Sequence, residues 1–462
     1  MRRGHFRFQI SDCRLRNYGN RMTRVIIAAC IMCGLASGVP LYRDTLPNGL
    51  AIVSYVDHRL PMTDIAFVCR SGSASDPEGK WGLANGTVTL MTRGTKTMTA
   101  DSVASIVEFL GAQFNGYAGN DNSMISLRVL AKDLVTGLDL LTDAVRNPSF
   151  EAKEVERARA QGLAGVREMS DDPMARVMVD FYQTLFPGHP YAHQTIGDTV
   201  SLMKITREDL VAFHKDHYVP NNCFIVAVGD FDRPELLKMI QARFGDMTRG
   251  DVPEVKAPDM PFPGKLRVKL IYRPDMNQTY VMSGHPGIAY SDSDRLATNL
   301  AAYILGGGAL ASRIGDAVRE EAGLAYEVRT VFDQDRLRGA FWAWVQTAKP
   351  KEAIAIMFRE IEKMQKDGAK KNELDDAQNY FAGSYPIRFS SNQGKLYEAV
   401  NIEIYQLGLD WADKYPGKIR ALTLDEVNRA ARERLHPGQY VMVVMGNVKK
   451  EDLGLSDVEW IE

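Results

Sequence analysis

Two histidines in the segment His189-Pro-Tyr-Ala-His193 stand four residues apart, a spacing that lets two imidazoles on one helix bind the same metal ion. Pro190 lies between them and would break the helix that this arrangement requires. We therefore interpret the segment as a structural loop, with a metal site as the less favoured alternative. His214 and His217 lie on a predicted helix but lack an acidic third ligand at a useful spacing. We expect both to be exposed on the surface.

A second candidate for chemistry is the stretch 72–95, in which a predicted strand ends, a loop with Gly and Pro follows, and a helix begins. Leu83, Ala84, Val88 and Met91 recur at helical spacing and mark one buried face of that helix.

This stretch resembles the helix that carries the H-x-x-E-H motif in the insulinase/pitrilysin zinc peptidases, the inverzincins. The shared features are a Gly-Ser after a strand, an Asp-Pro, a Gly-Leu-Ala at the helix start and an Arg-Gly-Thr at its end. Asn85, Val88 and Thr89 stand where the first His, the Glu and the second His of the motif would be. The family's third ligand is a later Glu, and Glu168 in Val-Arg-Glu-Met-Ser-Asp-Asp-Pro173 is the best match.

These substitutions have a chemical consequence, because zinc is bound by imidazole, thiolate or carboxylate ligands, usually three from the protein at a catalytic site. Asn85 and Thr89 offer only weak, neutral oxygen ligands, and Val88 cannot act as a general base. A single carboxylate at Glu168 cannot hold zinc tightly. We therefore predict a degenerate zinc site, with no metal and no cofactor in this chain.

The resemblance also implies a role for Arg319 and Tyr326 in the segment Val-Arg-Glu-Glu-Ala-Gly-Leu-Ala-Tyr. In the family, the half without zinc supplies an Arg at a helix end and a Tyr seven residues later to the active site of the zinc half. Peptide hydrolysis builds negative charge on the carbonyl oxygen, to which a guanidinium and a phenol can donate hydrogen bonds. The alternative is that Arg319 pairs with acids on its own helix and Tyr326 fills a place in the core.

By this resemblance the chain is the non-catalytic subunit of a two-subunit peptidase that degrades peptides in an enclosed chamber. A sister chain with H-x-x-E-H would bind the zinc, and its Glu would activate the metal-bound water. A scaffolding protein, similar to the respiratory-complex core subunits that share this fold, is an alternative from another class. An independent metallopeptidase would need ligands that the sequence does not show.

The resemblance runs from about Leu41 to Val448 and implies an α+β fold of two homologous halves. Each half is expected to be a mostly antiparallel sheet with helices packed on it, and the two form a clam-shell half of the closed chamber. A duplication in the sequence agrees with this, because 205–231 is echoed without a gap by 422–448. Both copies contain a Thr helix cap, an amphipathic helix, a Pro break, a buried strand and a Gly turn.

The expected domains are an N-terminal α+β domain at 39–250, a stiff Pro-rich linker at 251–264 and a C-terminal α+β domain at 265–462. Predicted strands include a hairpin within 41–55 and a strand at 62–69. Cys69 and Cys223 lie within predicted strands. We interpret them as two small buried hydrophobic residues, with a disulfide between them as the alternative.

Composition and the N-terminal segment limit the expected partners and the expected cellular location of the chain. The 462 residues carry a net charge of −2, with 45% hydrophobic and 25% charged residues, which argues against a nucleic-acid partner. Residues 1–38 are predicted to be a targeting segment, because an apolar run at 25–36 follows Met22-Thr-Arg and is too short to span a membrane. We predict export to a bacterial periplasm without a transmembrane span in the mature chain. A lipoprotein anchor at Cys30 and a translation start at Met22 are left open.

Overall fold

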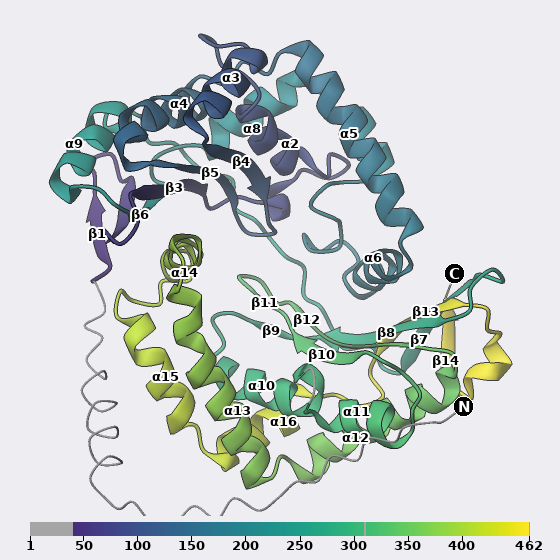
Figure 1. Cartoon of the computed structure of the whole chain (residues 1–462). Coiled ribbons are helices and arrows are strands. Elements are labelled where there is room, and N and C mark those ends of the chain that lie inside the picture. Colours follow the sequence, from purple (N-terminus) through teal and green to yellow (C-terminus); the bar gives the residue numbers. More distant parts are fainter. Residues whose placement is uncertain (1–39, 309–310, 462) are drawn as a thin grey trace, which may run out of the picture. The chain divides into compact units, whose positions relative to one another are not determined.

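Two six-stranded sheets and the helices packed on them make up residues 40–308 and 311–461, which the computed structural model describes (Figure 1). From Leu41 onward these residues form one compact unit. The predicted targeting segment 1–38, with Met22 and Cys30, lies outside the described residues. No helix in the described ranges is both long enough and apolar enough to cross a membrane.

The first sheet has the strand order β1-β2-β6-β3-β5-β4, and among its contacts in the described residues β2 and β6 alone run parallel. The predicted hairpin and the strand at 62–69 are confirmed. The strands are β1 (Tyr42–Thr45), β2 (Ala51–Val56), β3 (Met62–Cys69), β4 (Gln113–Ala118), β5 (Ser123–Leu130) and β6 (Cys223–Gly229).

The second sheet has the order β10-β12-β8-β13-β7-β14, with antiparallel contacts from β10 to β13 and parallel contacts from β13 to β7 and from β7 to β14. Its strands are β7 (Leu266–Tyr272), β8 (Thr279–Pro286), β10 (Val328–Phe332), β12 (Ala340–Thr347), β13 (Val441–Gly446) and β14 (Val458–Ile461). A short parallel pair, β9 (Ile288–Ala289) and β11 (Gln334–Asp335), stands apart from it.

Helices cover both sheets. Those of the first half are α2 (Leu83–Met91), α3 (Ala100–Leu110), α4 (Leu134–Arg146), α5 (Ala152–Asp171), α6 (Pro173–Leu185), α7 (Thr199–Lys204), α8 (Arg207–His217) and α9 (Arg233–Phe244). Those of the second half are α10 (Arg295–Ala302), α11 (Arg313–Gly315), α12 (Pro350–Asp367), α13 (Lys371–Ser384), α14 (Asn392–Ile404), α15 (Trp411–Ala421) and α16 (Leu424–Arg434). Two π-helical segments, η3 (Tyr303–Gly307) and η4 (Asp316–Glu321), lie before β10.

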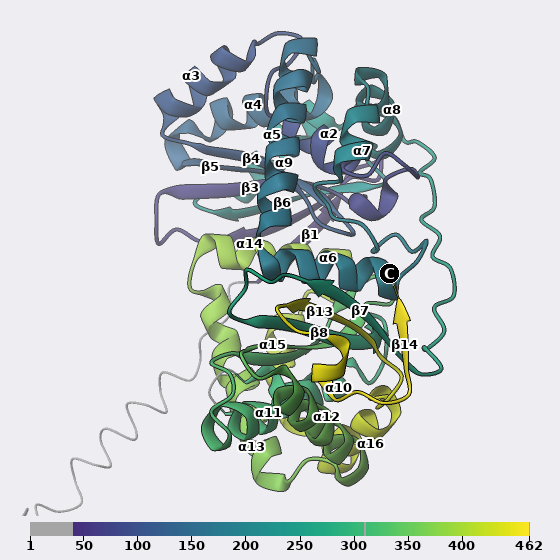
Figure 2. The ribbon, with the colours of Figure 1, turned by 90° about the vertical axis from the view of Figure 1, so that its right-hand side faces the viewer.

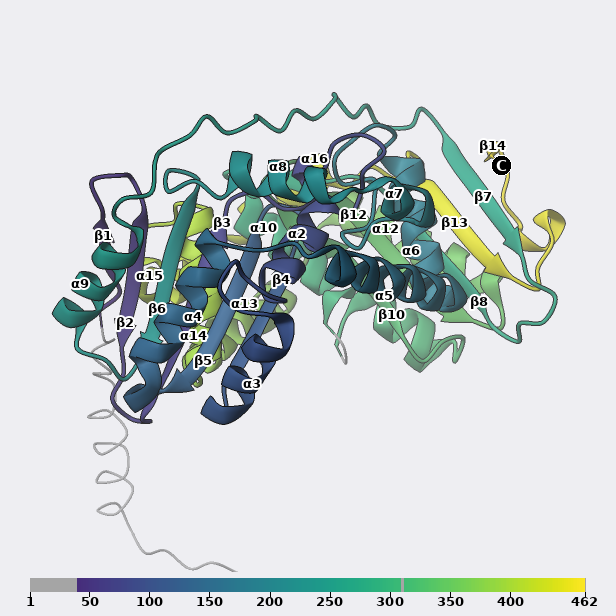
Figure 3. The same cartoon turned by 90° about the horizontal axis from the view of Figure 1, so that it is seen from above.

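The predicted duplication is present in the structure. Helices α8 and α16 begin and end at corresponding residues of the two copies, and strands β6 and β13 follow them. Thr206 and Thr423 cap these helices, and each forms a reciprocal capping box with an acidic residue three positions later. The chain therefore contains two homologous α+β halves. Residues 251–264 contain no helix or strand and run in extended form toward β7 (Figure 3).

The two halves exchange one helix each. Helix α6 of the first half packs on β8 and β13, and helix α14 of the second half packs on β3 and β6, so that both lie between the sheets (Figure 2). Phe181 of α6 joins a buried cluster on the second sheet, and Leu396 of α14 joins one on the first. Because the central strands are covered on both faces, β6 is buried along its whole length.

Cys69 and Cys223 stand directly opposite each other on β3 and β6, with both side chains buried. Both thiols are free in this structure, and both lie against the backbone oxygen of His217. The interpretation as two small buried residues describes their packing.

Candidate functional site

Helix α2 is held in place at its N-terminus by a residue that comes before it in the chain. The Asp76 carboxylate accepts hydrogen bonds from the backbone N–H groups of Gly82 and Ala84, both at 2.7 Å. Its side chain has no exposed surface, and this burial raises the pKa of Asp76. Asp76 therefore supplies the hydrogen-bond acceptor that the N-cap residue, Gly82, cannot provide from a side chain of its own.

The other end of α2 approaches β4 closely. A Cβ atom added at Gly116 of β4 would stand 2.3 Å from the backbone oxygen of Val88, so no larger residue fits without a shift of the backbone. Val88 itself is fully buried and contributes to the core of the first half. The residue at the position of the motif's Glu is therefore a packing residue.

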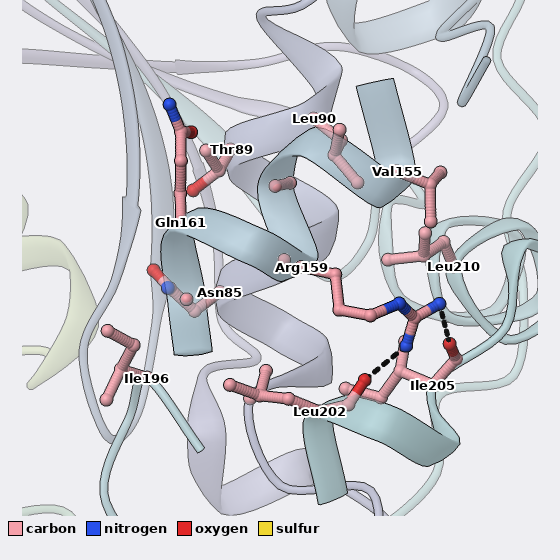
Figure 4. Close-up of a pocket in the computed structure, with 14 residues that line it drawn as sticks. Asn85, Thr89, Leu90, Val155, Arg159, Gln161, Ile196, Leu202, Ile205 and Leu210 are labelled. Carbon is pink, nitrogen blue, oxygen red and sulfur yellow. Dashed lines mark hydrogen bonds between the residues drawn. The ribbon is translucent and has the colours of Figure 1, made fainter. Parts of the chain in front are cut away.

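Asn85 and Thr89 lie on another side of α2, where they face helix α5 across a cavity of about 230 Å³ (Figure 4). Gln161 of α5 completes a polar group at this cavity with them. The other lining residues are mostly apolar or small, namely Gly82, Gly86, Leu90, Val155, Ala158, Arg159, Gly162, Ile196, Leu202, Ile205 and Leu210.

Glu168 does not line this cavity, and its side chain is exposed. It lies seven residues after Gln161 on α5, which is almost two helical turns and therefore about 10 Å along the helix axis. Gln161, which the sequence interpretation missed, takes the place facing Asn85 and Thr89. The small residues Ala158 and Gly162, at a helical spacing of four, could have indicated this face of α5.

The residues at the cavity do not fit a zinc ion. They supply two amides and a hydroxyl but no His, Cys, Asp or Glu, and they include the cationic Arg159. Across 40–308 and 311–461, no group of three or more such ligand residues could hold a metal. Val88 offers no base to activate a water molecule, so we derive no metal-dependent step in this chain.

Arg159 is fixed in the wall of the cavity. Its guanidinium donates a hydrogen bond to the backbone oxygen of Ile205 at 2.9 Å and another to that of Leu202 (Figure 4). It also pairs with Glu156 at 3.1 Å. These contacts join α5 to α7 and to the segment that follows α7, and they offset the positive charge of Arg159.

Arg319 and Tyr326 lie in the second half, and neither lines the cavity at Asn85. Arg319 belongs to the π-helical segment η4, where its Nε atom is 2.8 Å from a carboxylate oxygen of Glu320 and its side chain is 18% exposed. Tyr326 follows in the loop before β10 and is 92% exposed. The alternative for Arg319, a pair with an acid of its own helix, is thus present, whereas Tyr326 does not fill a place in the core.

The loop histidines are bound up in local packing. His189 is buried against Phe186, with ring centroids 4.9 Å apart, and its Nδ1 accepts the Tyr191 backbone N–H at 3.0 Å. Burial lowers the pKa of His189 to about 4. His193 stacks on Trp81, and its Nε2 lies 3.1 Å from the backbone oxygen of Ser73.

The expectation that His214 and His217 are exposed is wrong. His217 is 5% exposed, and its Nδ1 lies 2.9 Å from the Ser71 hydroxyl. His214 is half-buried and donates from Nε2 to the backbone oxygen of Val145 at 2.7 Å. The His214 ring packs against Phe150 and the His217 ring against Phe213, so neither histidine is an exposed surface residue.

The sequence and the fold of this chain are similar to those of known proteins. Residues 52–199 match the model of the insulinase family (peptidase family M16), and residues 204–381 match the model of the peptidase M16 inactive domain. An uncharacterized zinc protease of Rickettsia bellii is 26% identical over 370 residues, which cover 79% of this chain and 86% of that protein.

A protein of Helicobacter pylori named non-peptidase homolog YmxG is 23% identical over 424 residues, 91% of this chain and 97% of that protein. The crystal structure of a peptidase M16 inactive domain from Pseudomonas fluorescens superposes with a TM-score of 0.82 at 28% identity. That match covers 88% of this chain and 98% of the other.

Proposed function

This chain belongs to the insulinase (peptidase M16) family, and from that premise we propose that it is the non-catalytic subunit of a heterodimeric zinc peptidase. A sister chain with an intact H-x-x-E-H motif would bind the zinc and the peptide substrate. This chain would lend Arg319 and Tyr326 to the sister's active site.

The observation that carries the proposal is the contrast between α2 and the loop before β10. Asn85, Val88 and Thr89 supply neither ligands nor a base, so hydrolysis needs another chain. Tyr326, by comparison, holds a large aromatic ring in solvent, where it adds nothing to the core of its own half. A side chain of this type, with an apolar ring and a polar tip, suits a contact with a second protein.

The chemistry of the pair fits peptide hydrolysis. A guanidinium and a phenolic hydroxyl can donate hydrogen bonds to the oxyanion that develops in the transition state. Because these hydrogen bonds stabilise the transition state more than the bound substrate, they raise kcat. Arg319 stands in a π-helical segment, a rare conformation that is frequent at functional sites. The relative described as a non-peptidase homolog supports a member of the family without activity of its own.

We test the proposal by co-expressing the chain with a sister that carries H-x-x-E-H and measuring cleavage of an unstructured peptide. Neither chain alone should cleave it, and the pair should. Arg319→Ala should lower kcat of the pair, whereas Arg420→Ala, at an exposed Arg in the last turn of α15, should not.

Two results would contradict the proposal. Unchanged turnover with Arg319→Ala and Tyr326→Phe together would remove their role in the sister's active site. Capture of partners that all lack a zinc motif would instead favour the scaffolding alternative.

We also propose that the chain is exported. The support is the apolar run 25–36, which follows a basic residue and precedes small residues. N-terminal sequencing of the mature protein from the periplasmic fraction should begin near residue 39. A Cys30→Ser variant separates the alternatives, because only a lipoprotein would leave the membrane fraction on that change.

A further inference from the structure

The cavity between α2 and α5 has an apolar floor and a polar mouth. Leu90, Val155, Ile205 and Leu210 are at most 7% exposed, and their side chains form the inner wall. Asn85 and Thr89 are half-buried, and Gln161 is exposed, so the polar groups stand on the solvent side. The arrangement is that of a small ligand pocket, in which apolar walls bury a ligand and a few polar groups orient it.

The polar side chains at the mouth have no hydrogen-bond partner among residues 40–308 and 311–461. Among the residues drawn in Figure 4, hydrogen bonds start from Arg159 alone, and none involves the side chains of Asn85, Thr89 or Gln161. Each amide offers two N–H donors and a carbonyl acceptor. Two amides and a hydroxyl are therefore available to a bound molecule.

The volume limits the size of that molecule. At about 230 Å³, the cavity is larger than the ~150 Å³ cavity that accommodates benzene in an engineered protein. It is smaller than the roughly 300–1,000 Å³ of pockets that hold drug-sized ligands. One branched aliphatic or aromatic group together with one small polar group would fill it.

The charge of the lining favours an uncharged ligand. Among the described residues that line the cavity none is acidic, so none of them would compensate a bound cation. The positive charge of Arg159 is engaged by Glu156 and by the backbone oxygens of Leu202 and Ile205. Burying a charged group without a partner is costly, and a pocket of this size offers too few contacts to offset that cost.

We propose that this cavity binds one uncharged apolar side chain of an unstructured peptide, of leucine or phenylalanine size. Asn85 and Gln161 hold the peptide group next to that side chain. The former catalytic helix thus serves as a binding site in this chain. This role does not depend on Arg319, Tyr326 or a sister subunit, so it can fail or succeed independently of the proposed function.

The test uses the isolated full chain and N-acetyl-leucinamide as the probe, titrated by protein NMR. A ligand of this size should bind with a dissociation constant in the millimolar range. Ala158→Leu, which fills the cavity from α5, should weaken binding more than tenfold. Ala164→Leu on the exposed side of the same helix is the matched control and should bind as the wild type does.

Charge and polarity are tested with two further probes and one further variant. N-acetyl-leucine and N-acetyl-lysinamide, which carry a carboxylate and an ammonium group, should bind more weakly than the neutral amide. Gln161→Leu should weaken binding of the amide about two- to tenfold through the loss of a hydrogen bond. Because Gln161 is exposed, this variant should fold normally, and Gln241→Leu on the exposed side of α9 is its control.

Three results would overturn the proposal. The first is no saturable shift with N-acetyl-leucinamide up to its solubility limit. The second is equal binding in a folded Ala158→Leu variant. The third is tighter binding of N-acetyl-leucine than of the amide, which would show that Arg159 recruits an anion instead.

Discussion

Helices α6 and α14 occupy corresponding places in the two halves, and each packs on the sheet of the other half. Each helix is also held there by an ion pair with the opposite half. The buried residue on α6 is acidic, whereas the buried residue on α14 is basic. Asp180 of α6 lies 3.0 Å from Lys269 of β7, and Lys395 of α14 pairs with Asp57 after β2. The two halves therefore share the same helix-on-sheet packing, although different residues make the contacts in each half.

The halves differ in the segment that leads into the edge strand. In the first half α3 is a regular helix, capped by Thr99 and ended by Gly111 in the left-handed region, before β4. In the second half η3, α11 and the π-helical η4 take this part of the chain, before β10. The irregular segment is the one that carries Arg319 and Tyr326. The comparison shows that the two halves can keep the same packing while the segment before the edge strand differs, and the proposed role of Arg319 and Tyr326 falls in the irregular segment.

The largest expected effect is a loss of stability, and it tests whether α6 and α14 contribute similarly to holding the two halves together. Phe181→Ala should lower the free energy of unfolding by about 3–5 kcal/mol and Leu396→Ala by about 2–5 kcal/mol, because both side chains are buried against the opposite sheet. Urea unfolding of the whole chain measures both. Val200→Ala, at a residue that is 62% exposed, should change stability by less than about 0.5 kcal/mol.

A large loss for one helix and none for the other would break the comparison. It would mean that only one of the two exchanges holds the halves together.

The next effect tests the difference between the edge segments. In the proposed heterodimer, Tyr326→Phe should lower kcat up to about 10²–10³-fold, because it removes the hydroxyl that we propose donates to the developing oxyanion. Its stability should stay within about 0.5 kcal/mol of the wild type, since the ring is 92% exposed. Phe109, 89% exposed at the end of α3, is the corresponding control, and Phe109→Ala should leave kcat unchanged.

A third prediction compares the buried histidines of the halves. Burial lowers the pKa of His189 to about 4 and that of His285 to about 3, from an ordinary value near 6.5. The unfolded chain therefore binds protons that the folded chain does not, so stability should fall as the pH drops below 6.5. The loss from His189 should be complete near pH 4 and that from His285 near pH 3.

Urea unfolding across this pH range provides the measurement. His189→Asn keeps an acceptor for the Tyr191 N–H but does not titrate, and it should flatten the slope between pH 6.5 and 4. An unchanged slope would assign the acid sensitivity of the chain to other groups.

The smallest effect compares the starts of α2 and α10. Asp76→Ala should cost about 0.5–2 kcal/mol, because Asp76 caps α2 from a buried position. Asp294 at the start of α10 makes no capping hydrogen bond and instead pairs with Arg434 near the surface. Asp294→Ala should therefore cost less than about 1 kcal/mol in thermal or urea unfolding. Equal losses of stability in the two variants would show that the hydrogen bonds from Asp76 do not stabilise the start of α2 more than the Asp294–Arg434 pair stabilises α10.

Much of the fold could be predicted because the signals are local. Alternating apolar residues and an Asn-Gly turn gave the first hairpin, and the gapless echo of 205–231 in 422–448 gave the duplication. The exchange of α6 and α14 could not be predicted, since an amphipathic helix does not show in its sequence which sheet it will cover.

At the site, the lack of ligands at Asn85, Val88 and Thr89 could be predicted from residue types alone. The residue of α5 that faces Asn85 and Thr89 could not be predicted. Gln161 and Glu168 lie at different heights along α5, and the sequence does not show which height is level with α2. His217 was misplaced for a similar reason. A polar ring on a helix is buried when its neighbours provide hydrogen bonds, and Ser71, its partner, is distant in sequence.

The most direct test of the central claim is the zinc content of the purified proteins by elemental analysis. We expect no tightly bound zinc in the isolated chain, and one zinc in its complex with the H-x-x-E-H sister, lost when the sister's motif is removed. One tightly bound zinc per isolated chain would contradict the account, because it would give α2 a metal site of its own.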